Sequence, residues 1–286
     1  MKKYGRDLLE TFPVVGVIYR AMRNYYRVKD SNMRKTPYGF FLVGQKEHDD
    51  IFNDQFENLE IRLINSLIEH VDIFIDIGAN IGLFTMLARR AGKKVIAFEP
   101  LDQNLKFLYS NLYKNKFTDV EVYPIALSNE PGVATLYGAS MMASMVENWG
   151  DAVKSARQIV AISTLDIILG GRLMESSAFV KIDVEGHEFE VLLGAKKILE
   201  NSENTTWLIE VGLGEHHPDN QNIKFLDTFN IFLSRGYKVY AVGKSISLIN
   251  NDDINHLSLM TGRAEQINYL FTKKELPISL LNELNA

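Results

Sequence analysis

Three short apolar runs in the sequence each end in acidic residues or glycines. The first run, residues 73–77, carries Asp76 and leads into residues 78–82, Gly-Ala-Asn-Ile-Gly. The second ends in Glu99, and the third passes into residues 181–188, Lys-Ile-Asp-Val-Glu-Gly-His-Glu. Ionisable side chains at the end of a buried strand are costly unless they are paired or functional. We therefore predict a ligand site where the three runs end.

The residues after the first run indicate which ligand fits. Glycines let a ligand approach the backbone closely, as at the strand ends that bind dinucleotides. The Gly-x-Gly-x-x-Gly pattern of a nicotinamide site is absent, because position 80 is asparagine, and Asp76 would repel a diphosphate. A cationic ligand reverses this argument, since S-adenosylmethionine carries a sulfonium and an ammonium group that favour a nearby carboxylate. Glu99 can accept hydrogen bonds from both hydroxyls of its ribose.

The surrounding pattern predicts how these residues are positioned. Short apolar runs alternate with segments in which apolar residues recur at helical spacing. Such alternation is typical of an α/β fold, a mostly parallel sheet with helices on both faces. Asp102 is predicted to cap the second helix. We expect strands at residues 73–77, 94–98, 120–123, 179–182, 207–211, 237–242 and 267–271, and helices at residues 81–90, 102–113, 187–200 and 223–234.

The alternation is interrupted between the third and fourth of these strands. Residues 132–137 and 158–163 are predicted to be additional strands on either side of a loop, residues 138–157. Flexible methionines on a long loop can cap a ligand site or fill a local gap in the packing, and the sequence favours neither. The loop contains Met141, Met142, Met145 and Trp149.

Five motifs, in this order and spacing, resemble the FkbM family of S-adenosylmethionine-dependent methyltransferases over residues 70–245. They are Asp76-Ile-Gly-Ala-Asn-Ile-Gly, Phe98-Glu99-Pro100, Ala126-Leu127-Ser128, Lys181-Ile-Asp-Val-Glu-Gly-His-Glu and Ile209-Glu210-Val211. The resemblance implies a Rossmann-like class I methyltransferase with a seven-stranded sheet, and O-methylation of a hydroxyl of a sugar, glycan or natural product. The acceptor would then be a small molecule or a saccharide. One departure is His187, where relatives often carry a small residue such as alanine.

These arguments together predict the roles of individual residues. Asp76, Gly78 and Asn80 are expected to contact the amino-acid and sulfonium side of S-adenosylmethionine, and Glu99 its ribose. Residues 126–127 are expected to border the adenine. The predicted cofactor-binding residues are Asp76, Gly78, Ala79, Asn80, Gly82, Glu99, Pro100, Asn104, Ala126, Leu127 and Asp183.

Asp183, Glu185 and His187 are the candidates for a catalytic base. A sugar hydroxyl is a weak nucleophile at neutral pH, so a base that takes its proton would help the reaction. We favour Glu185 and Asp183, because His187 is the departure from the family, although an imidazole has the more suitable unperturbed pKa. The structural alternative is an ion pair between Lys181 and Asp183, with Glu185 and Glu188 stabilising the start of the next helix.

A pair of histidines follows the strand at residues 207–211. His216 and His217, with Glu215, can line an acceptor pocket or bind a metal. Adjacent side chains point in opposite directions in an extended chain, so a shared metal would need a special turn. We predict no metal site.

Charge is unevenly distributed along the chain. The net charge is −5 at pH 7, but residues 1–35 contain nine Lys and Arg against three Asp and Glu, which leaves −11 on residues 36–286. The acidic body argues against a nucleic-acid-binding protein. We interpret residues 1–70 as a helical appendage, with an amphipathic helix at residues 52–70, and residues 71–286 as the methyltransferase domain. Residues 1–35 can contact an anionic membrane, or form a solvated basic helix packed on the domain.

Composition narrows the remaining possibilities. The 286 residues are 46% hydrophobic and 23% charged, which excludes disorder as the main state. The absence of cysteine excludes disulfides, thiolate metal sites and cysteine nucleophiles. Since there is also no apolar run of about 20 residues, we expect a cytoplasmic protein. Two alternatives remain: a non-catalytic adenosyl-binding module that acts through residues 1–35, and a nicotinamide-dependent oxidoreductase, which the missing glycine disfavours.

Overall fold

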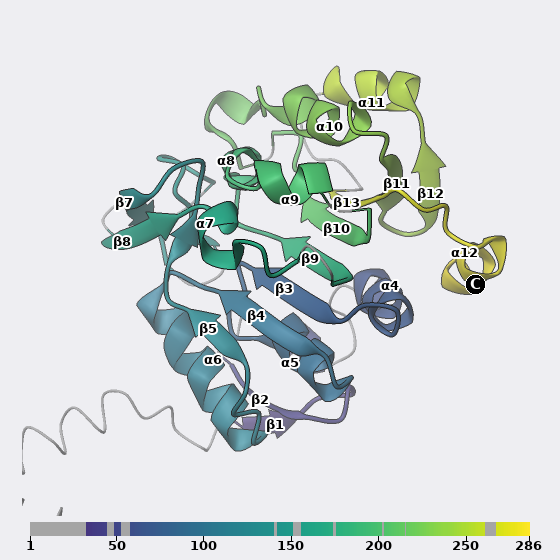
Figure 1. The fold of residues 1–286 in the computed structure, drawn as a ribbon. Coiled ribbons are helices and arrows are strands. Elements are labelled where there is room, and N and C mark those ends of the chain that lie inside the picture. The colour runs from purple at the N-terminus through teal and green to yellow at the C-terminus, as the bar shows by residue number, and fades with distance from the viewer. Residues whose placement is uncertain are drawn as a thin grey trace, which may run out of the picture.

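The computed structural model describes residues 33–286 except 45–48, 53–57, 140–141, 151–155, 174–175, 202, 215 and 261–266 (Figure 1). Its central element is an eight-stranded sheet with the strand order β12-β11-β13-β10-β9-β3-β4-β5. These strands are β3 (Ile73–Ile77), β4 (Lys94–Phe98), β5 (Glu121–Tyr123), β9 (Ala178–Ile182), β10 (Thr205–Glu210), β11 (Lys238–Val242), β12 (Ile246–Ile249) and β13 (Asn268–Thr272).

The sheet is parallel on one side and antiparallel on the other. Neighbours among β5, β4, β3, β9 and β10 pair in parallel, whereas β13 is antiparallel to β10 and β11, and β12 is antiparallel to β11. The α/β fold and the seven predicted strands are confirmed. The predicted strand number is wrong, because β12 is an eighth strand. In β12 Ile246 alone is buried, so this segment lacks the apolar run that identifies the other strands.

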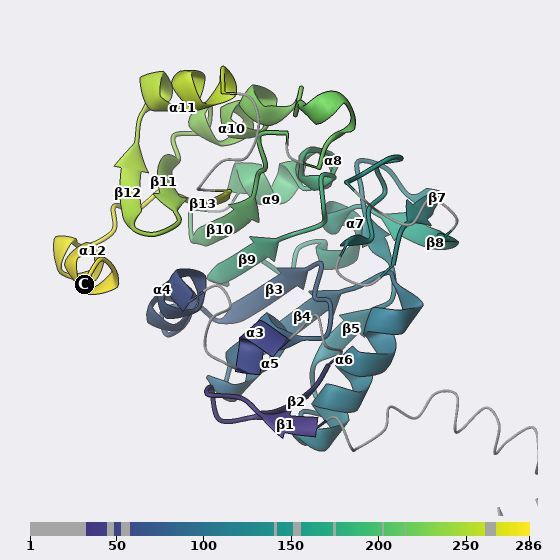
Figure 2. The same ribbon diagram turned by 180° about the vertical axis from the view of Figure 1, so that it is seen from behind.

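Two sets of helices cover the two faces of the sheet (Figures 1 and 2). One face packs against α7 (Leu165–Leu169), α8 (Glu188–Leu193), α9 (Lys196–Asn201), α10 (Phe225–Leu233) and α11 (Asn251–Ser258). The other packs against α3 (Asp49–Phe52), α4 (Asn58–Ile68), α5 (Leu83–Arg90), α6 (Asp102–Lys114) and α12 (Ile278–Leu284).

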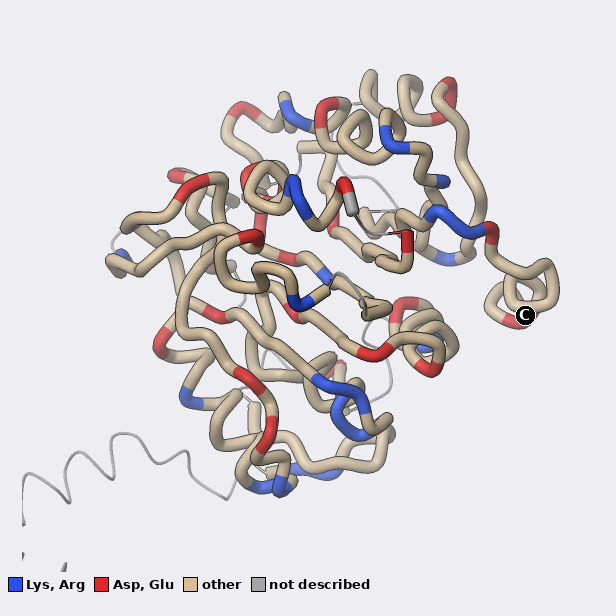
Figure 3. Tube along the Cα trace, in the orientation of Figure 1, with Lys and Arg blue, Asp and Glu red and all other residues tan. Residues whose placement is uncertain are grey.

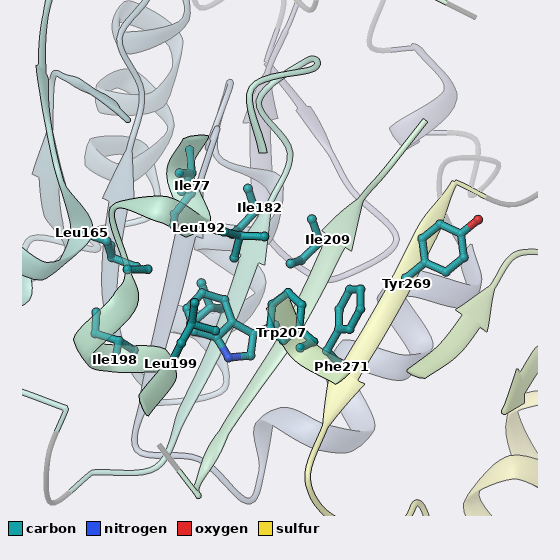
Figure 4. Close-up of a cluster of buried hydrophobic side chains, with 14 of the residues drawn as sticks. Ile77, Leu165, Ile182, Leu192, Ile198, Leu199, Trp207, Ile209, Tyr269 and Phe271 are labelled. Carbon is teal, nitrogen blue, oxygen red and sulfur yellow. The ribbon is translucent and has the colours of Figure 1, made fainter. Parts of the chain in front are cut away.

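Alternating side chains along the strands build a separate core on each face. On β3, Ile75 and Ile77 enter one core and Phe74 enters the other. Phe74 stacks on Phe179 of β9 with ring centroids 5.5 Å apart. Figure 4 shows the first core, where side chains of the strands meet those of α7, α8 and α9. Because both faces are covered, every residue of β3 and β9 is buried.

Two details of the predicted helices are wrong. The helix expected at residues 187–200 is divided into α8 and α9 at Gly194, where a Cβ atom would lie only 2.1 Å from the carbonyl oxygen of Ser128. Asp102 is the first residue of α6 and not its cap. The residue before it, Leu101, donates its backbone N–H to the Glu99 carboxylate at 2.8 Å.

The interruption after β5 forms a second, three-stranded sheet. Its strands are β6 (Ala126–Leu127), β7 (Gly132–Tyr137) and β8 (Arg157–Ser163), in the order β6-β8-β7. The two predicted strands are confirmed, and β6 was too short to be recognised. A small core of Leu101, Ala126, Leu136 and Val160 attaches this sheet to the start of α6. The methionine-bearing loop between β7 and β8 therefore starts beside the first turn of α6.

The described part of residues 1–70 is not only helical, and residues 1–32 lie outside the described residues. β1 (Met33–Lys35) and β2 (Phe41–Val43) form an antiparallel pair before α3 and α4. The side chains of Phe40, Leu42 and Leu63 belong to the same core as Phe74 of β3. Asn111 of α6 pairs with both backbone polar groups of Val43, at 2.7 and 3.1 Å. No helix among the described residues is long and apolar enough to cross a membrane.

We expect Asn111→Ala to destabilise the fold by about 2–4 kcal/mol, because Asn111 is fully buried and also donates to the carbonyl of Ile81 at 2.9 Å. Its loss leaves three buried backbone groups without partners. Urea unfolding measures the change. The matched control is Asn255→Ala on the exposed side of α11, for which we expect a change within about 0.5 kcal/mol. Equal unfolding midpoints for the two variants would contradict this account.

Candidate functional site

A cavity of about 220 Å³ lies at the carboxyl ends of β3, β4 and β9, where ligands bind in open parallel sheets. Eight of the predicted cofactor-binding residues line it, and so do all three catalytic candidates, since Asp183 is one of the eight and Glu185 and His187 lie beside it. The eight are Gly78, Asn80, Glu99, Pro100, Asn104, Ala126, Leu127 and Asp183. Asp76, Ala79 and Gly82 are not among its lining residues.

The turn between β3 and α5 brings the backbone of two strands close together. Gly78 has φ of +86°, and a Cβ atom there would lie 1.7 Å from the carbonyl oxygen of Asp183. A side chain at this position would push the loops after β3 and β9 apart. Asn80 also has a positive φ, of 51°. Its Oδ1 is buried and has no hydrogen-bond partner within the described part of the chain, so it offers the cavity an unused acceptor.

Asp76 lies behind the wall of the cavity. It is fully buried and accepts a hydrogen bond from Thr85 Oγ1 at 2.5 Å, which ties β3 to α5. Burial raises its pKa, and the charge of Lys181 lowers it in part. Asp76 thus joins β3 to α5 and does not line the cavity, and its contact with a cofactor stays a prediction. Ala79 packs in the core, and Gly82 with φ of +94° begins α5 where a Cβ would meet Leu108.

Glu99 joins the turns after β3 and β4. Its Oε2 accepts the backbone N–H of Asn80 at 2.8 Å, and its Oε1 accepts that of Leu101 at 2.8 Å. Burial raises its pKa to about 7 in spite of these hydrogen bonds. The side chain of Asn104 is a third hydrogen-bond partner, and since a carboxylate has about four lone pairs, Glu99 can still accept a hydroxyl donor from the cavity.

The end of β9 carries a buried ion pair. Lys181 Nζ lies 2.7 Å from Asp183 Oδ2 and 4.6 Å from the ring centroid of Phe84. Lys181 is only 3% exposed, and a buried charge of this kind must be paired. The Lys–Asp pair of the structural alternative is thus present, while Asp183 also faces the cavity.

Glu185 is held in a left-handed conformation by the loop between β7 and β8. Its φ is +56°, its carbonyl oxygen accepts Ser144 Oγ at 2.5 Å, and its Oε2 accepts Trp149 Nε1 at 2.9 Å. Burial and the nearby charge of Asp183 raise its pKa to about 8. Trp149 packs against Gly186, where a Cβ atom would lie 2.1 Å from the ring.

The same loop also closes part of the cavity. Met142 and Met145 are among its lining residues, and Met145 additionally packs against the small core of the second sheet. The methionines therefore both line the ligand cavity and fill a gap in the packing. Met141 lies outside the described residues. Sequence reasoning named Trp149 but missed its bond to Glu185, since 36 residues separate the two and no local pattern links them.

α8 begins at Glu188, and His187 is the residue before it. His187 Nε2 lies 3.0 Å from Ser128 Oγ, and burial lowers the pKa of this imidazole to about 4. Glu188 Oε1 accepts the backbone N–H groups of Val184 and Gly186 at 3.1 and 3.0 Å, and burial raises its pKa to about 7. Glu188 thus matches the structural alternative, whereas His187 remains on the cavity wall.

A second chamber of about 130 Å³ adjoins the first, with Met142, Glu185 and Glu210 on both walls. Its other lining residues include Trp149, His216 and His217. The histidines precede a short 3₁₀ helix, η4 (Pro218–Asn220), and Glu215 lies outside the described residues. Among the described residues no group of three His, Asp or Glu side chains is placed to hold a metal ion.

A segment of one curated protein is similar to part of this chain. AMB antimetabolite synthetase AmbE of Pseudomonas aeruginosa is 29% identical over 160 residues, which cover 43% of this chain and 8% of that protein. The chain thus spans less than a tenth of that relative's length.

Two solved structures have similar topology at low sequence identity. An O-methyltransferase from Bacillus cereus in complex with SAH has a TM-score of 0.43 and 11% identity, covering 74% of this chain and 79% of that one. Monomeric WbdD has a TM-score of 0.45 and 11% identity, covering 83% of this chain and 46% of that one.

The family comparison covers the loops from which the cavity is built. The methyltransferase FkbM domain matches residues 76–239, more than half of the 286 residues. This range includes Asn80, Glu99, Asp183 and Glu185. The resemblance found in the sequence is confirmed, and the chain belongs to the FkbM methyltransferase family.

Proposed function

We propose that this protein transfers a methyl group from S-adenosylmethionine to a hydroxyl oxygen of a small-molecule or saccharide acceptor. The observation that carries the proposal is the cavity at the tips of β3, β4 and β9, with Asn80, Glu99 and Asp183 on its wall. The adjoining chamber gives an acceptor a place beside it. A non-catalytic adenosyl-binding module would not need such a chamber, so this alternative is not favoured.

The residues of the cavity fit the proposed cofactor group by group. The unused Asn80 Oδ1 and the Asp183 carboxylate suit an ammonium and a sulfonium. Glu99 suits the ribose hydroxyls, and Ala126 and Leu127 offer apolar surface for the adenine. Bound S-adenosylmethionine would supply an electrophilic methyl carbon on a cationic sulfur.

The protein's own task is to position the acceptor hydroxyl and remove its proton. Glu185 lies on the wall shared by the two cavities, so it can reach a hydroxyl held between them. With its pKa raised to about 8, Glu185 is a stronger base than an ordinary carboxylate, but it is ready to accept a proton only when ionised. Asp183 is paired with Lys181, and His187 lies at Ser128, so we assign the base role to Glu185.

We expect Glu99→Ala to weaken S-adenosylhomocysteine binding by about tenfold or more, because ribose hydroxyls and two backbone N–H groups lose their acceptor. Isothermal calorimetry measures the affinity. The matched control is Glu121→Ala. Glu121 lies on β5, and its exposed carboxylate pairs with Arg172. Unchanged affinity in Glu99→Ala would remove Glu99 from the cofactor site.

We expect turnover to rise with pH through about 8 as Glu185 loses its proton, and Glu185→Gln to lower it by about 10²–10⁴-fold. The assay follows labelled methyl transfer from S-adenosylmethionine into an extract of the source cells, with mass spectrometry of the product. S-adenosylhomocysteine affinity should remain nearly unchanged.

Glu188→Gln is the matched control, because the glutamine amide keeps an oxygen acceptor for the two backbone N–H groups that Glu188 now binds. Because the charge of Glu188 helps to raise the pKa of Glu185, this variant should retain the rise of turnover with pH, displaced to lower pH. Labelling at the wild-type rate in Glu185→Gln would show that Glu185 is not the base. No labelled product in any extract, despite tight S-adenosylhomocysteine binding, would contradict the proposed activity itself.

We also propose that residues 1–35 contact an anionic lipid surface. A surface hollow beside the β1–β2 turn is lined by Arg89, Arg90, Lys114 and Lys116, and its lining includes no carboxylate. Arg89 is partly neutralised by Asp119, 2.7 Å away. Figure 3 shows Lys and Arg gathered at this lower end of the molecule. The hollow lies where α5 and α6 end, about 20 Å along α6 from the cavity at its start.

Vesicle co-sedimentation of the full chain tests this contact. We expect binding to phosphatidylserine-containing vesicles at low salt but not to phosphatidylcholine alone, and about a tenfold loss after removal of residues 1–32 or in Lys114→Glu/Lys116→Glu. Lys196→Glu/Lys197→Glu, exposed on α9, makes the same charge change and should bind normally. An equal loss in the control, or no binding by the full chain, would overturn the contact.

A further inference from the structure

The chamber beside the cofactor cavity contains a buried nitrogen that nothing in the described chain uses. His217 Nε2 is buried and has no hydrogen-bond partner among the described residues. Buried polar atoms of this kind are almost always satisfied by a neighbour, a water or a ligand. His217 lines this chamber and also a neighbouring surface pocket, and we consider a ligand group in the chamber as the partner of the covered Nε2.

The imidazole of His217 is held firmly, so its free nitrogen has a fixed place. The ring packs edge-on against Trp149 with centroids 4.6 Å apart, and the backbone N–H of His217 donates to Gly214 at 3.1 Å. Gly214 lies so close to the following turn that a Cβ would be 2.2 Å from the carbonyl oxygen of Asn220. Trp149 Nε1 in turn donates a hydrogen bond to the carboxylate of Glu185.

The described wall of the chamber offers little to an anionic acceptor group. No Lys or Arg is among the described residues that line it, so these residues offer a phosphate or carboxylate no counter-charge. Burial lowers the pKa of His217 to about 4 and raises that of Glu185 to about 8, so both are uncharged at pH 7. The remaining titratable groups on its wall are His216, Glu188 and Glu210, and Glu188 already accepts two backbone N–H groups.

On the basis of the proposed function, we propose that this chamber binds an uncharged, hydroxyl-bearing part of the acceptor and that His217 Nε2 forms a hydrogen bond to it. The hydroxyl to be methylated would then lie at Glu185, on the wall between the two cavities. His217 is a specificity-determining residue in this arrangement. It selects the acceptor and leaves binding of the cofactor to the first cavity.

The charge of the methylated product tests the proposal directly. Extract of the source cells is separated into neutral, anionic and cationic fractions by ion exchange, and each is incubated with the full chain and methyl-labelled S-adenosylmethionine. If the chamber holds the whole acceptor, this acceptor is a neutral molecule, and we propose it in this stricter form; we therefore expect the label in the neutral fraction. Label mainly in a charged fraction would overturn this inference and leave the methyltransferase proposal intact, whereas no label in any fraction would overturn both.

The second arm uses the purified labelled acceptor and variants of His217. We expect His217→Ala to raise the KM for the acceptor by about tenfold or more, with kcat and S-adenosylhomocysteine affinity little changed. His217→Gln, which keeps a polar group of similar size, should recover part of the loss and serves if the alanine variant unfolds. His256→Ala, exposed on α11, is the matched control. An unchanged KM in both His217 variants would remove His217 from acceptor recognition.

Discussion

Lys181 places an ammonium group, almost wholly removed from water, among carboxyl groups that belong to separate elements of the fold. Its Nζ lies 2.7 Å from Asp183, and its charge lowers the pKa of Asp76 and Glu185 against the opposing effect of burial. A buried carboxylate is tolerated when it is paired or hydrogen-bonded, and is otherwise protonated. The ionised state of the carboxyl groups at the ends of β3 and β9 therefore depends in part on this buried cation.

Close backbone approach is the second requirement of the site, and it explains the glycines of the two motifs. Gly78 allows the loop after β3 to touch the carbonyl of Asp183, and Gly186 allows Trp149 to lie against the loop after β9. A Cβ atom at either position would overlap its neighbour, so the cavity walls that carry Asn80, Asp183 and Glu185 would have to move apart.

The sequence predicts this fold well where a signal is local. The strands at residues 73–77 and 94–98 are found as predicted, because buried parallel strands are continuous apolar runs between turn residues. Eight predicted residues meet at one cavity, because parallel strands end at the same edge of the sheet. The position of Asp76 behind the wall could not be predicted, since it depends on Thr85 reaching back from α5. The strand β12 and the break at Gly194 likewise depend on tertiary contacts.

The loop of the three-stranded sheet makes the long-range contacts that hold Glu185. Ser144 and Trp149, both from the loop between β7 and β8, bond to the carbonyl and the carboxylate of Glu185, which has a positive φ that a glutamate adopts only at a cost. The family motif after β9 therefore supplies the residue, while the insertion fixes its backbone conformation and side-chain direction. Trp149 also packs on His217, so one loop positions groups on the walls of both cavities. A change in this loop would therefore affect the proposed base Glu185 and the walls of both cavities together.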